Sequence, residues 1–203
     1  MILLSVDDND DPNDVMAELH ELYKNKLSAS FDFDFNFDLG TFELFKNYNT
    51  CFIASVLKLA NNKADFFIAR ISATYHLSTA SRYPHSGSTE YQAWGFGTLK
   101  ADFGHILIKP ETFIDKIHEF VNPIELDFDD DKEFSRKFYV ITSDKTKALL
   151  QMTAAFRDAV QLILTEDVVI EIVQNKIIIG NKKIITMDAC VDFINFLDRI
   201  SSI

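Results

Sequence analysis

The chain contains little cysteine, glycine, proline or tryptophan, and it has no long apolar run. Its 203 residues include 2 Cys, 6 Gly, 4 Pro and 1 Trp. No apolar run approaches the roughly 18 residues that indicate a membrane-spanning helix. The apolar run after Met1 is too short for a signal peptide, and aspartates rather than basic residues accompany it. The sequence therefore predicts a protein without a membrane span, located in the cytoplasm.

The two cysteines, Cys51 and Cys190, lie far apart in the sequence, and each lies in an apolar segment. Cysteine in such a setting behaves as a small hydrophobic residue. We interpret both as buried thiols of a protein in a reducing compartment. A disulfide between them is the alternative, although their spacing does not favour it.

Basic residues are scarce relative to acidic ones: 20 Lys and Arg stand against 31 Asp and Glu, a formal net charge of −11. A strongly acidic protein repels phosphate backbones, and no basic stripe stands out along the chain. Nucleic acid is therefore not an expected partner, and anionic membrane surfaces are disfavoured for the same reason.

The remaining composition is that of a globular protein with an aromatic core. Apolar residues make up 47% and charged residues 25% of the chain, and 19 residues are Phe. A chain of this length suits one domain that buries about 70% of its unfolded surface. Residues 122–132 form an acidic connector, which we expect to be a solvated loop. It is the best internal boundary between a β-rich part, 1–121, and a second part, 133–203.

The first part predicts one helix followed by antiparallel strands. Pro12 follows Asp11, which suits the first turn of a helix over about 12–27. Two long β-rich runs are separated by a turn at 61–63 and predict an antiparallel hairpin. The expected strands are 42–45, 51–59, 66–76, 91–99 and 106–108, and a helix is expected from Pro110 to about Val121.

Residues 31–39 alternate strictly between apolar and polar side chains, beginning Phe-Asp-Phe-Asp. This pattern predicts a strand with one apolar and one acidic face. The alternative is a calcium loop that begins at Asp32 and ends at Glu43, since the oxygen ligands have the right spacing. Phe37, however, occupies the position where such a loop needs glycine. We therefore favour the strand and expect no bound metal.

The segment 78–90 is rich in Ser, Thr, Pro and Gly and has no apolar period, so it predicts a loop. Loops of this length in compact domains are often functional or disordered. The simpler interpretation is a mobile hairpin tip. The functional interpretation is a contact loop in which Arg82, Tyr83 and His85 grip a partner.

The second part predicts a strand, a helix, a three-stranded meander and a final helix. The strand is 138–141, and Asp144 offers an N-cap to the helix that follows. Thr153 can cap a second piece, so one kinked helix and two short helices are both allowed. The meander comprises 168–173, 176–179 and 184–186, with a turn at Gly180-Asn181-Lys182. The last helix spans about 188–200. Together the elements predict an α+β fold.

Three segments of this second part resemble a family of uncharacterised bacterial proteins. They are Glu-Phe-Ser-Arg-Lys-Phe-Tyr-Val-Ile-Thr-Ser-Asp from Glu133, Ala-Leu-Leu-Gln-Met-Thr from Ala148, and Ile-Glu-Ile-Val-Gln-Asn-Lys-Ile-Ile-Ile from Ile170. The resemblance is best over about 90–181. Many members carry membrane helices before this domain, whereas this sequence contains no such segment. The resemblance implies a fold and no activity.

The sequence carries no recognisable catalytic motif or cofactor motif. Gly95 and Gly97 lack the third glycine and the helix start of a dinucleotide site. The five histidines are scattered without metal-ligand spacing, and neither a nucleophile elbow nor a phosphate loop is present. We therefore expect a non-enzymatic binding or interaction domain with a protein or small-molecule partner and no cofactor. The alternatives are an enzyme whose site is assembled by tertiary contacts and a structural protein that forms homo-oligomers.

Overall fold

The computed structural model describes residues 12–46, 48–75, 88–110, 123–163 and 167–203. In this part of the chain, all strands join one antiparallel sheet in the order β1-β2-β3-β4-β9-β8-β5-β7-β6. The strands are β1 (Ser30–Phe31), β2 (Thr50–Ala60), β3 (Asp65–Tyr75), β4 (Ser88–Thr98), β5 (His105–Pro110), β6 (Ile124–Glu125), β7 (Phe138–Thr142), β8 (Val169–Val173) and β9 (Lys176–Ile184). With the helices described next, this sheet confirms the predicted α+β class.

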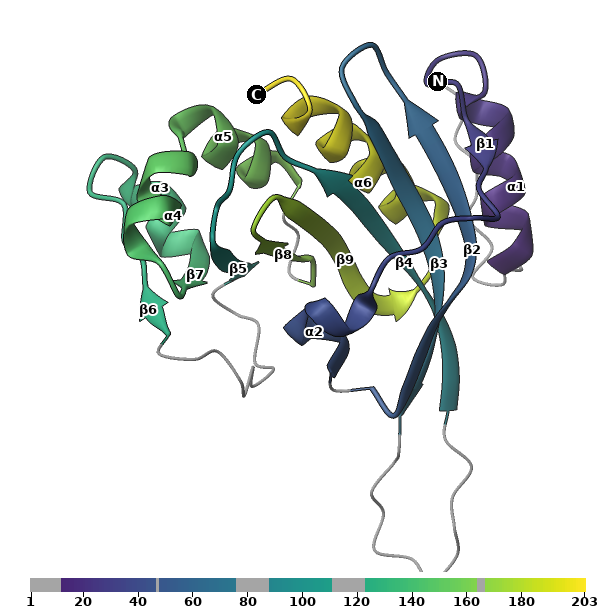
Figure 1. Cartoon of the computed structure of the whole chain (residues 1–203), viewed down its shortest axis with the longest axis horizontal. Helices are drawn as coiled ribbons and strands as arrows, with labels where there is room; N and C mark the ends of the chain where they lie inside the picture. The colour runs from purple at the N-terminus through teal and green to yellow at the C-terminus, as the bar shows by residue number, and fades with distance from the viewer. Residues whose placement is uncertain (1–11, 47, 76–87, 111–122, 164–166) are drawn as a thin grey trace, which may run out of the picture.

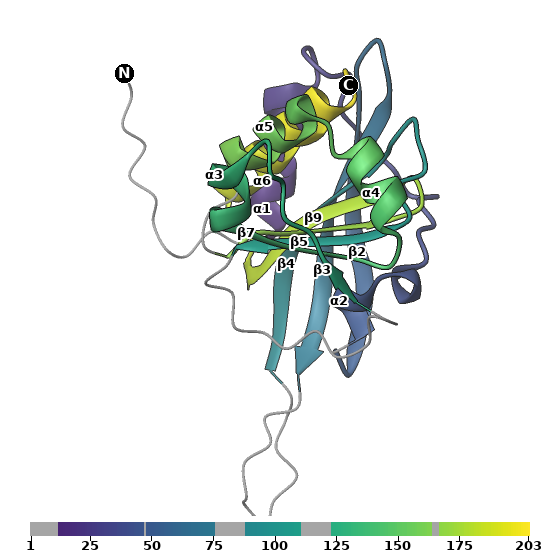
Figure 2. The same cartoon turned by 90° about the vertical axis from the view of Figure 1, so that its left-hand side faces the viewer.

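Helices cover one face of the sheet, as Figures 1 and 2 show. The longest, α6 (Met187–Ile200), packs on β3 and β4 and is flanked by α1 (Pro12–Tyr23) and α5 (Ala154–Ile163). The short helices are η1 (Leu39–Thr41), α2 (Glu43–Lys46), α3 (Lys132–Lys137) and α4 (Lys145–Gln151). The segment that contains η1 and α2 crosses the opposite face of the sheet. The sheet therefore has a hydrophobic core on each side.

Much of the predicted element order is confirmed. The hairpin of β2 and β3 forms around the turn at 61–63, and β4, β5, β7 and α6 lie close to the predicted ranges. The first helix is shorter than predicted, ending at Tyr23. Asp144 caps α4, accepting a hydrogen bond from the backbone N–H of Lys147 at 3.0 Å. Of the two forms allowed for the helix after Asp144, the structure has two short helices, α4 and α5.

The predicted strand over 31–39 is wrong. Only Ser30 and Phe31 form strand pairs with β2, the N–H of Asp32 donates to the Val56 carbonyl at 3.0 Å, and the chain then leaves the sheet. The carboxylates of Asp32 and Asp38 accept hydrogen bonds from the backbone N–H groups two residues ahead, at 3.0 Å each. Such local bonds favour turns over the pairing of a β-strand with its neighbour. Phe33 is 93% exposed. The strand predicted at 42–45 is likewise wrong, because these residues end η1 and form α2.

The predicted three-stranded meander is also wrong. β9 continues through Gly180 to Ile184, so β8 and β9 form a simple hairpin whose second strand is long. The backbone of β9 stays in the sheet because β4 pairs with it, with a register shift between Gln92 and Trp94. A Cβ on Gly180 would lie 2.4 Å from the Trp94 ring. The glycine thus permits close packing against an indole and does not make a turn.

Two further predictions lie outside the described residues: the helix expected after Pro110, and the tip of the 78–90 loop. Pro110 itself is the last residue of β5. Within the described ranges, no helix combines the length and the apolar character needed to cross a membrane.

Candidate functional site

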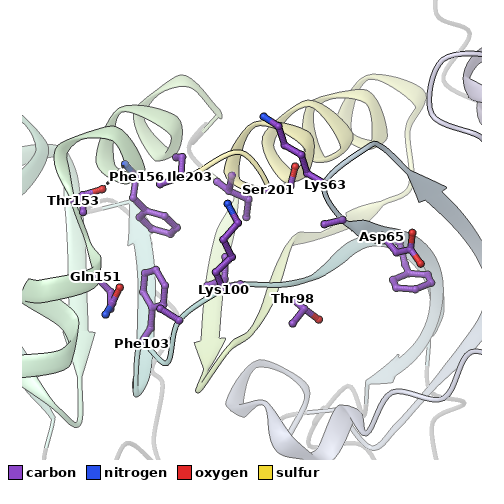
Figure 3. Close-up of a pocket in the computed structure, with 15 residues that line it drawn as sticks. Lys63, Asp65, Thr98, Lys100, Phe103, Gln151, Thr153, Phe156, Ser201 and Ile203 are labelled. Atoms are coloured by element: carbon purple, nitrogen blue, oxygen red, sulfur yellow. Dashed lines mark hydrogen bonds between the residues drawn. The ribbon is translucent and has the colours of Figure 1, made fainter.

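A pocket of about 520 Å³ opens where four segments meet at one end of the helix-covered face (Figure 3). Two of them connect strands, namely the β2–β3 turn and the β4–β5 connection. The other two belong to the helical layer, namely the α4–α5 junction and the end of α6. A cavity of this size falls within the range of small-molecule sites in proteins. Its lining includes Lys63, Asp65, Leu99, Lys100, Ala101, Phe103, Gln151, Thr153, Phe156, Ile200 and Ser201.

The base of the pocket is apolar and aromatic. Phe103 and Phe156 are buried, and their ring centroids lie 5.3 Å apart at an interplanar angle of 48°. Leu99 and Ile200 are also buried and belong to the same hydrophobic core. In Figure 3 both rings lie at the end of the pocket formed by the α4–α5 junction and the β4–β5 connection. A ligand reaching this end would exchange water for aromatic contacts.

The rim of the pocket carries two lysines and one carboxylate. Asp65 is already paired, since its Oδ2 lies 2.6 Å from Nζ of Lys58, and this contact raises the pKa of Lys58. Nζ of Lys63 donates to Oγ of Ser202 at 2.7 Å. Lys100 is exposed and makes no hydrogen bond or ion pair with any described residue. Figure 3 shows its side chain rising through the middle of the pocket. The rim is therefore locally cationic.

The side chain of Asn61 fixes the wall made by the β2–β3 turn. Its Oδ1 accepts from the backbone N–H groups of Lys63 and Ala64, at 2.7 and 2.8 Å. Its Nδ2 donates to Asp198 Oδ1 at 2.5 Å and to Ser201 Oγ at 2.9 Å. One amide thus joins the hairpin turn to the end of α6.

Backbone hydrogen bonds fix the β4–β5 connection. The N–H of Leu99 donates to the carbonyl of Asn175 at 2.7 Å, and that of Phe103 donates to Gln174 at 2.8 Å. Gln174 in turn donates to the carbonyl of Gly104 at 2.6 Å. Gly104 has a φ of +76°, a conformation that favours glycine. These bonds hold the segment that carries Phe103 and Lys100 to the β8–β9 turn.

Arg157, a polar residue of α5, fixes the α4–α5 junction. The side chain is 5% exposed. Its Nη1 donates to the Met152 carbonyl at 2.9 Å, its Nη2 to Asp130 at 2.7 Å and its Nε to Asp131 at 3.1 Å. The guanidinium also stacks over Phe128, 4.7 Å from the ring centroid. The prediction that the connector is merely solvated is wrong here, because its carboxylates hold this arginine.

A second polar cluster lies in the sheet around Glu171, which is fully buried in β8. Its Oε1 accepts from the backbone N–H of Glu43 at 2.9 Å and lies 2.7 Å from His105 Nε2. Its Oε2 accepts from the N–H of Leu44 at 3.0 Å. Both oxygens are occupied, so the carboxylate anchors α2 to the sheet. We assign it a structural role.

The contact residues proposed from the sequence, Arg82, Tyr83 and His85, lie outside the described residues. Cys51 and Cys190 are free thiols; Cys190 is buried as predicted, whereas Cys51 is only partly buried. Burial raises the pKa of Cys51 to about 11 and that of Cys190 to about 12, so neither is a thiolate nucleophile near neutral pH. In the ranges that the structure describes, no three His, Cys, Asp or Glu side chains are grouped to hold a metal ion.

The sequence analysis did not predict this pocket or its lining residues. Phe103 and Phe156 are 53 positions apart by their numbering, and each alone indicates only a core residue. Nothing near Lys100 distinguishes it from other surface lysines. The only available signal was the abundance of phenylalanine, which predicted an aromatic core and no particular cavity.

Comparison with known proteins adds a fold relationship. No family model matches the chain, and no curated protein matches it significantly. Among solved structures, the chain is similar to the crystal structure of the mycobacterial trehalose monomycolate transport factor A, TtfA. The TM-score is 0.61 over 93% of each chain, and 6% of the residues are identical. At this identity the similarity concerns the fold alone.

Proposed function

We propose that this protein is a non-enzymatic binding domain and that it holds a small molecule in the pocket at the end of α6. The observation that carries this proposal is the aromatic base formed by Phe103 and Phe156 within a cavity of about 520 Å³. Apolar concave sites with a few polar groups at the rim are the usual form of ligand sites.

The walls of the pocket support this proposal because hydrogen bonds within the protein hold them in place. Asn61, Gln174 and Arg157 each fix a different wall through the hydrogen bonds described above. A site that is already ordered loses less conformational entropy when a ligand binds. The geometry thus favours binding to a preformed cavity.

The ionisable groups of the pocket favour binding over catalysis. Among the described residues of the lining, the ionisable side chains are Lys63, Lys100 and Asp65. Asp65 is bound by Lys58, and the lining includes neither histidine nor cysteine. General acid–base chemistry typically uses a histidine or a free carboxylate within reach of the substrate. The enzyme alternative has no comparable supporting constellation in this pocket.

The structural neighbour is consistent with a binding role. As its name states, TtfA is a transport factor for trehalose monomycolate. For this chain we carry over only the expectation that the shared fold serves binding. Membership of the uncharacterised bacterial family, a cytoplasmic location and homo-oligomer formation stay predictions.

The test uses the uncharged fluorescent probe 1-N-phenylnaphthylamine and substitutions that fill the pocket. Ala101→Trp and Ala64→Trp place an indole at two points of the lining, and Ala155→Trp on the exposed side of α5 is the matched control. We expect saturable binding to the unmodified protein, weakened about tenfold or more by either filling substitution and unchanged in the control. Melting temperatures verify that each variant is folded. Absence of saturable binding, or equal affinity in folded filled variants, would overturn the proposal.

A further inference from the structure

We propose that the ligand of this pocket is an amphipathic anion, with an apolar chain on the aromatic base and a negatively charged head group at Lys100 and Lys63. This inference rests on the proposed function and specifies the class of ligand. The shared chemistry of the head group is an anionic oxygen cluster, either a carboxylate or a phosphate ester.

The side chains of the rim carry two positive charges and one negative charge, in a chain whose formal net charge is −11. The single side-chain carboxylate among the described residues of the lining, that of Asp65, is paired with Lys58 at 2.6 Å. Asp102, next to the lining, is paired with Lys147 at 2.6 Å, and this contact holds the pKa of Asp102 below its ordinary value. Two lysine charges therefore remain at the rim without a carboxylate partner among the described residues.

Lys100 is the better placed of the two lysines for a head group. Lys63 already donates to Ser202, whereas Lys100 has no partner in the described residues. Its chain neighbours Leu99 and Ala101 line the pocket, and its own side chain extends through the middle of it (Figure 3). An ammonium group at this position can reach a ligand whose tail lies on Phe103 and Phe156. Gln151 and Thr98 offer neutral polar groups in the same lining.

The overall negative charge of the protein does not cancel this local preference. At physiological ionic strength, charges more than about 8 Å apart in solvent are largely screened. The lysines of the lining are the cations nearest to a bound ligand, so they dominate its electrostatic energy. Because both are solvent-exposed, each contact is worth at most about fivefold in affinity. A cationic head group would be repelled by the same charges.

The apolar base distinguishes an amphiphile from a free anion. Phosphate alone would contact the lysines and leave the aromatic end of the pocket unfilled. An apolar chain without a charge would fill that end and leave the two ammonium groups without a counter-charge. Only a molecule that combines both parts uses both features of the cavity.

The experiment compares ligands with one alkyl chain and different head groups by isothermal titration calorimetry below their micelle concentrations. The probes are decanoate, decyl phosphate, decanol and decyltrimethylammonium, with inorganic phosphate as the free anion. We expect decanoate and decyl phosphate to bind about tenfold more tightly than decanol, and decyltrimethylammonium and inorganic phosphate to bind more weakly still. Raising the salt concentration should reduce the advantage of the anions.

Variants then assign the head-group site. Lys100→Gln should remove most of the difference between decanoate and decanol while leaving decanol binding unchanged, and Lys100→Glu should reverse the preference. Lys145→Gln, on the exposed start of α4 and outside the lining, is the matched control. An anion preference that survives in both Lys100→Gln and Lys63→Gln would place the head group elsewhere and overturn the inference.

The outcomes separate this inference from the proposed function. If phenylnaphthylamine and decanol bind at the pocket and the anions bind no better, the binding role stands and the anionic ligand class is wrong. If inorganic phosphate binds as tightly as decyl phosphate, the site binds a free anion, and the proposal of an amphipathic ligand is wrong. If none of the decyl compounds binds and phenylnaphthylamine fails as well, the pocket itself is not a ligand site.

Discussion

Nε of Arg157 donates to Oδ2 of Asp131 across 3.1 Å and thereby joins α5 to the loop before α3. Asp131 also caps α3, because its side chain accepts from the N–H of Phe134 at 3.1 Å. One carboxylate thus serves a helix N-terminus and a buried guanidinium. The pair connects the acidic connector to one wall of the pocket.

Arg157→Met is expected to destabilise the protein by about 2–4 kcal/mol, measured by urea unfolding. Removing one partner of a buried ion pair usually costs about 3–5 kcal/mol, and the exposure of Asp130 reduces this value. Arg136→Met on the exposed side of α3 is the control and should change stability by less than about 0.5 kcal/mol. A similar small loss for both variants would show that the buried guanidinium is dispensable.

Phe156→Ala should cost about 3 kcal/mol, whereas Phe33→Ala should cost less than about 0.5 kcal/mol. Phe156 is 1% exposed and Phe33 is 93% exposed, so the two variants remove the same group from opposite environments. The value for Phe156 is at the low end for buried rings because the residue already borders a cavity. Thermal and urea unfolding measure both. Equal losses would contradict the burial that the structure assigns.

The elements predicted correctly are those in which local patterns and tertiary contacts agree. The stripe of α6 is an example, since Ile194 and Leu197 recur at helical spacing and both are buried. The strands β2 and β3 were predicted because two long β-rich runs flank a turn, and in the structure Asn61 stabilises this turn with hydrogen bonds to its backbone. In these places the sequence pattern and the final packing impose the same structure.

The errors occur where a partner distant in sequence decides the outcome. Alternation over 31–39 indicated a strand, but the sheet offers a pairing partner only to Ser30 and Phe31. Gly180 indicated a turn, whereas the Trp94 ring explains why glycine is needed there. Arg157 occupied a polar position of a helix, yet Asp130 and Asp131 bring it into the interior. None of these partners can be identified from local periodicity.

Glu171→Gln is expected to loosen α2 while the sheet remains folded. The amide has one acceptor where the carboxylate has two, so a backbone N–H of Glu43 or Leu44 loses its partner. An unsatisfied buried donor costs about 1–3 kcal/mol. Hydrogen exchange at the amides of these two residues should accelerate. The control is Glu133→Gln on exposed α3, which should leave their exchange unchanged; equal protection in Glu171→Gln would contradict the anchoring role.

Cys190→Ala is expected to reduce the loss of stability that the protein suffers at alkaline pH. Burial raises the pKa of the folded thiol to about 12, whereas an unfolded cysteine titrates near about 8.5. Above the lower value the unfolded chain binds fewer protons than the folded chain, so the free energy of unfolding falls as pH rises toward the folded pKa. At about pH 10 this effect amounts to at most about 2 kcal/mol for one thiol.

The measurement is urea unfolding of both proteins at about pH 7 and about pH 10, below and above the ordinary thiol pKa. At the lower pH the thiol is protonated in both states, so the difference between the proteins reports only the packing lost with the sulfur atom. At the higher pH the unfolded wild-type chain gains a thiolate that the variant cannot form, and the difference should shrink or change sign. Lysines and tyrosines titrate alike in both proteins, so their contributions to the free energy of unfolding cancel in this comparison. A difference that stays constant between the two pH values would show that Cys190 ionises as easily in the folded state as in the unfolded one. The complete burial of Cys190 in α6 argues against that outcome.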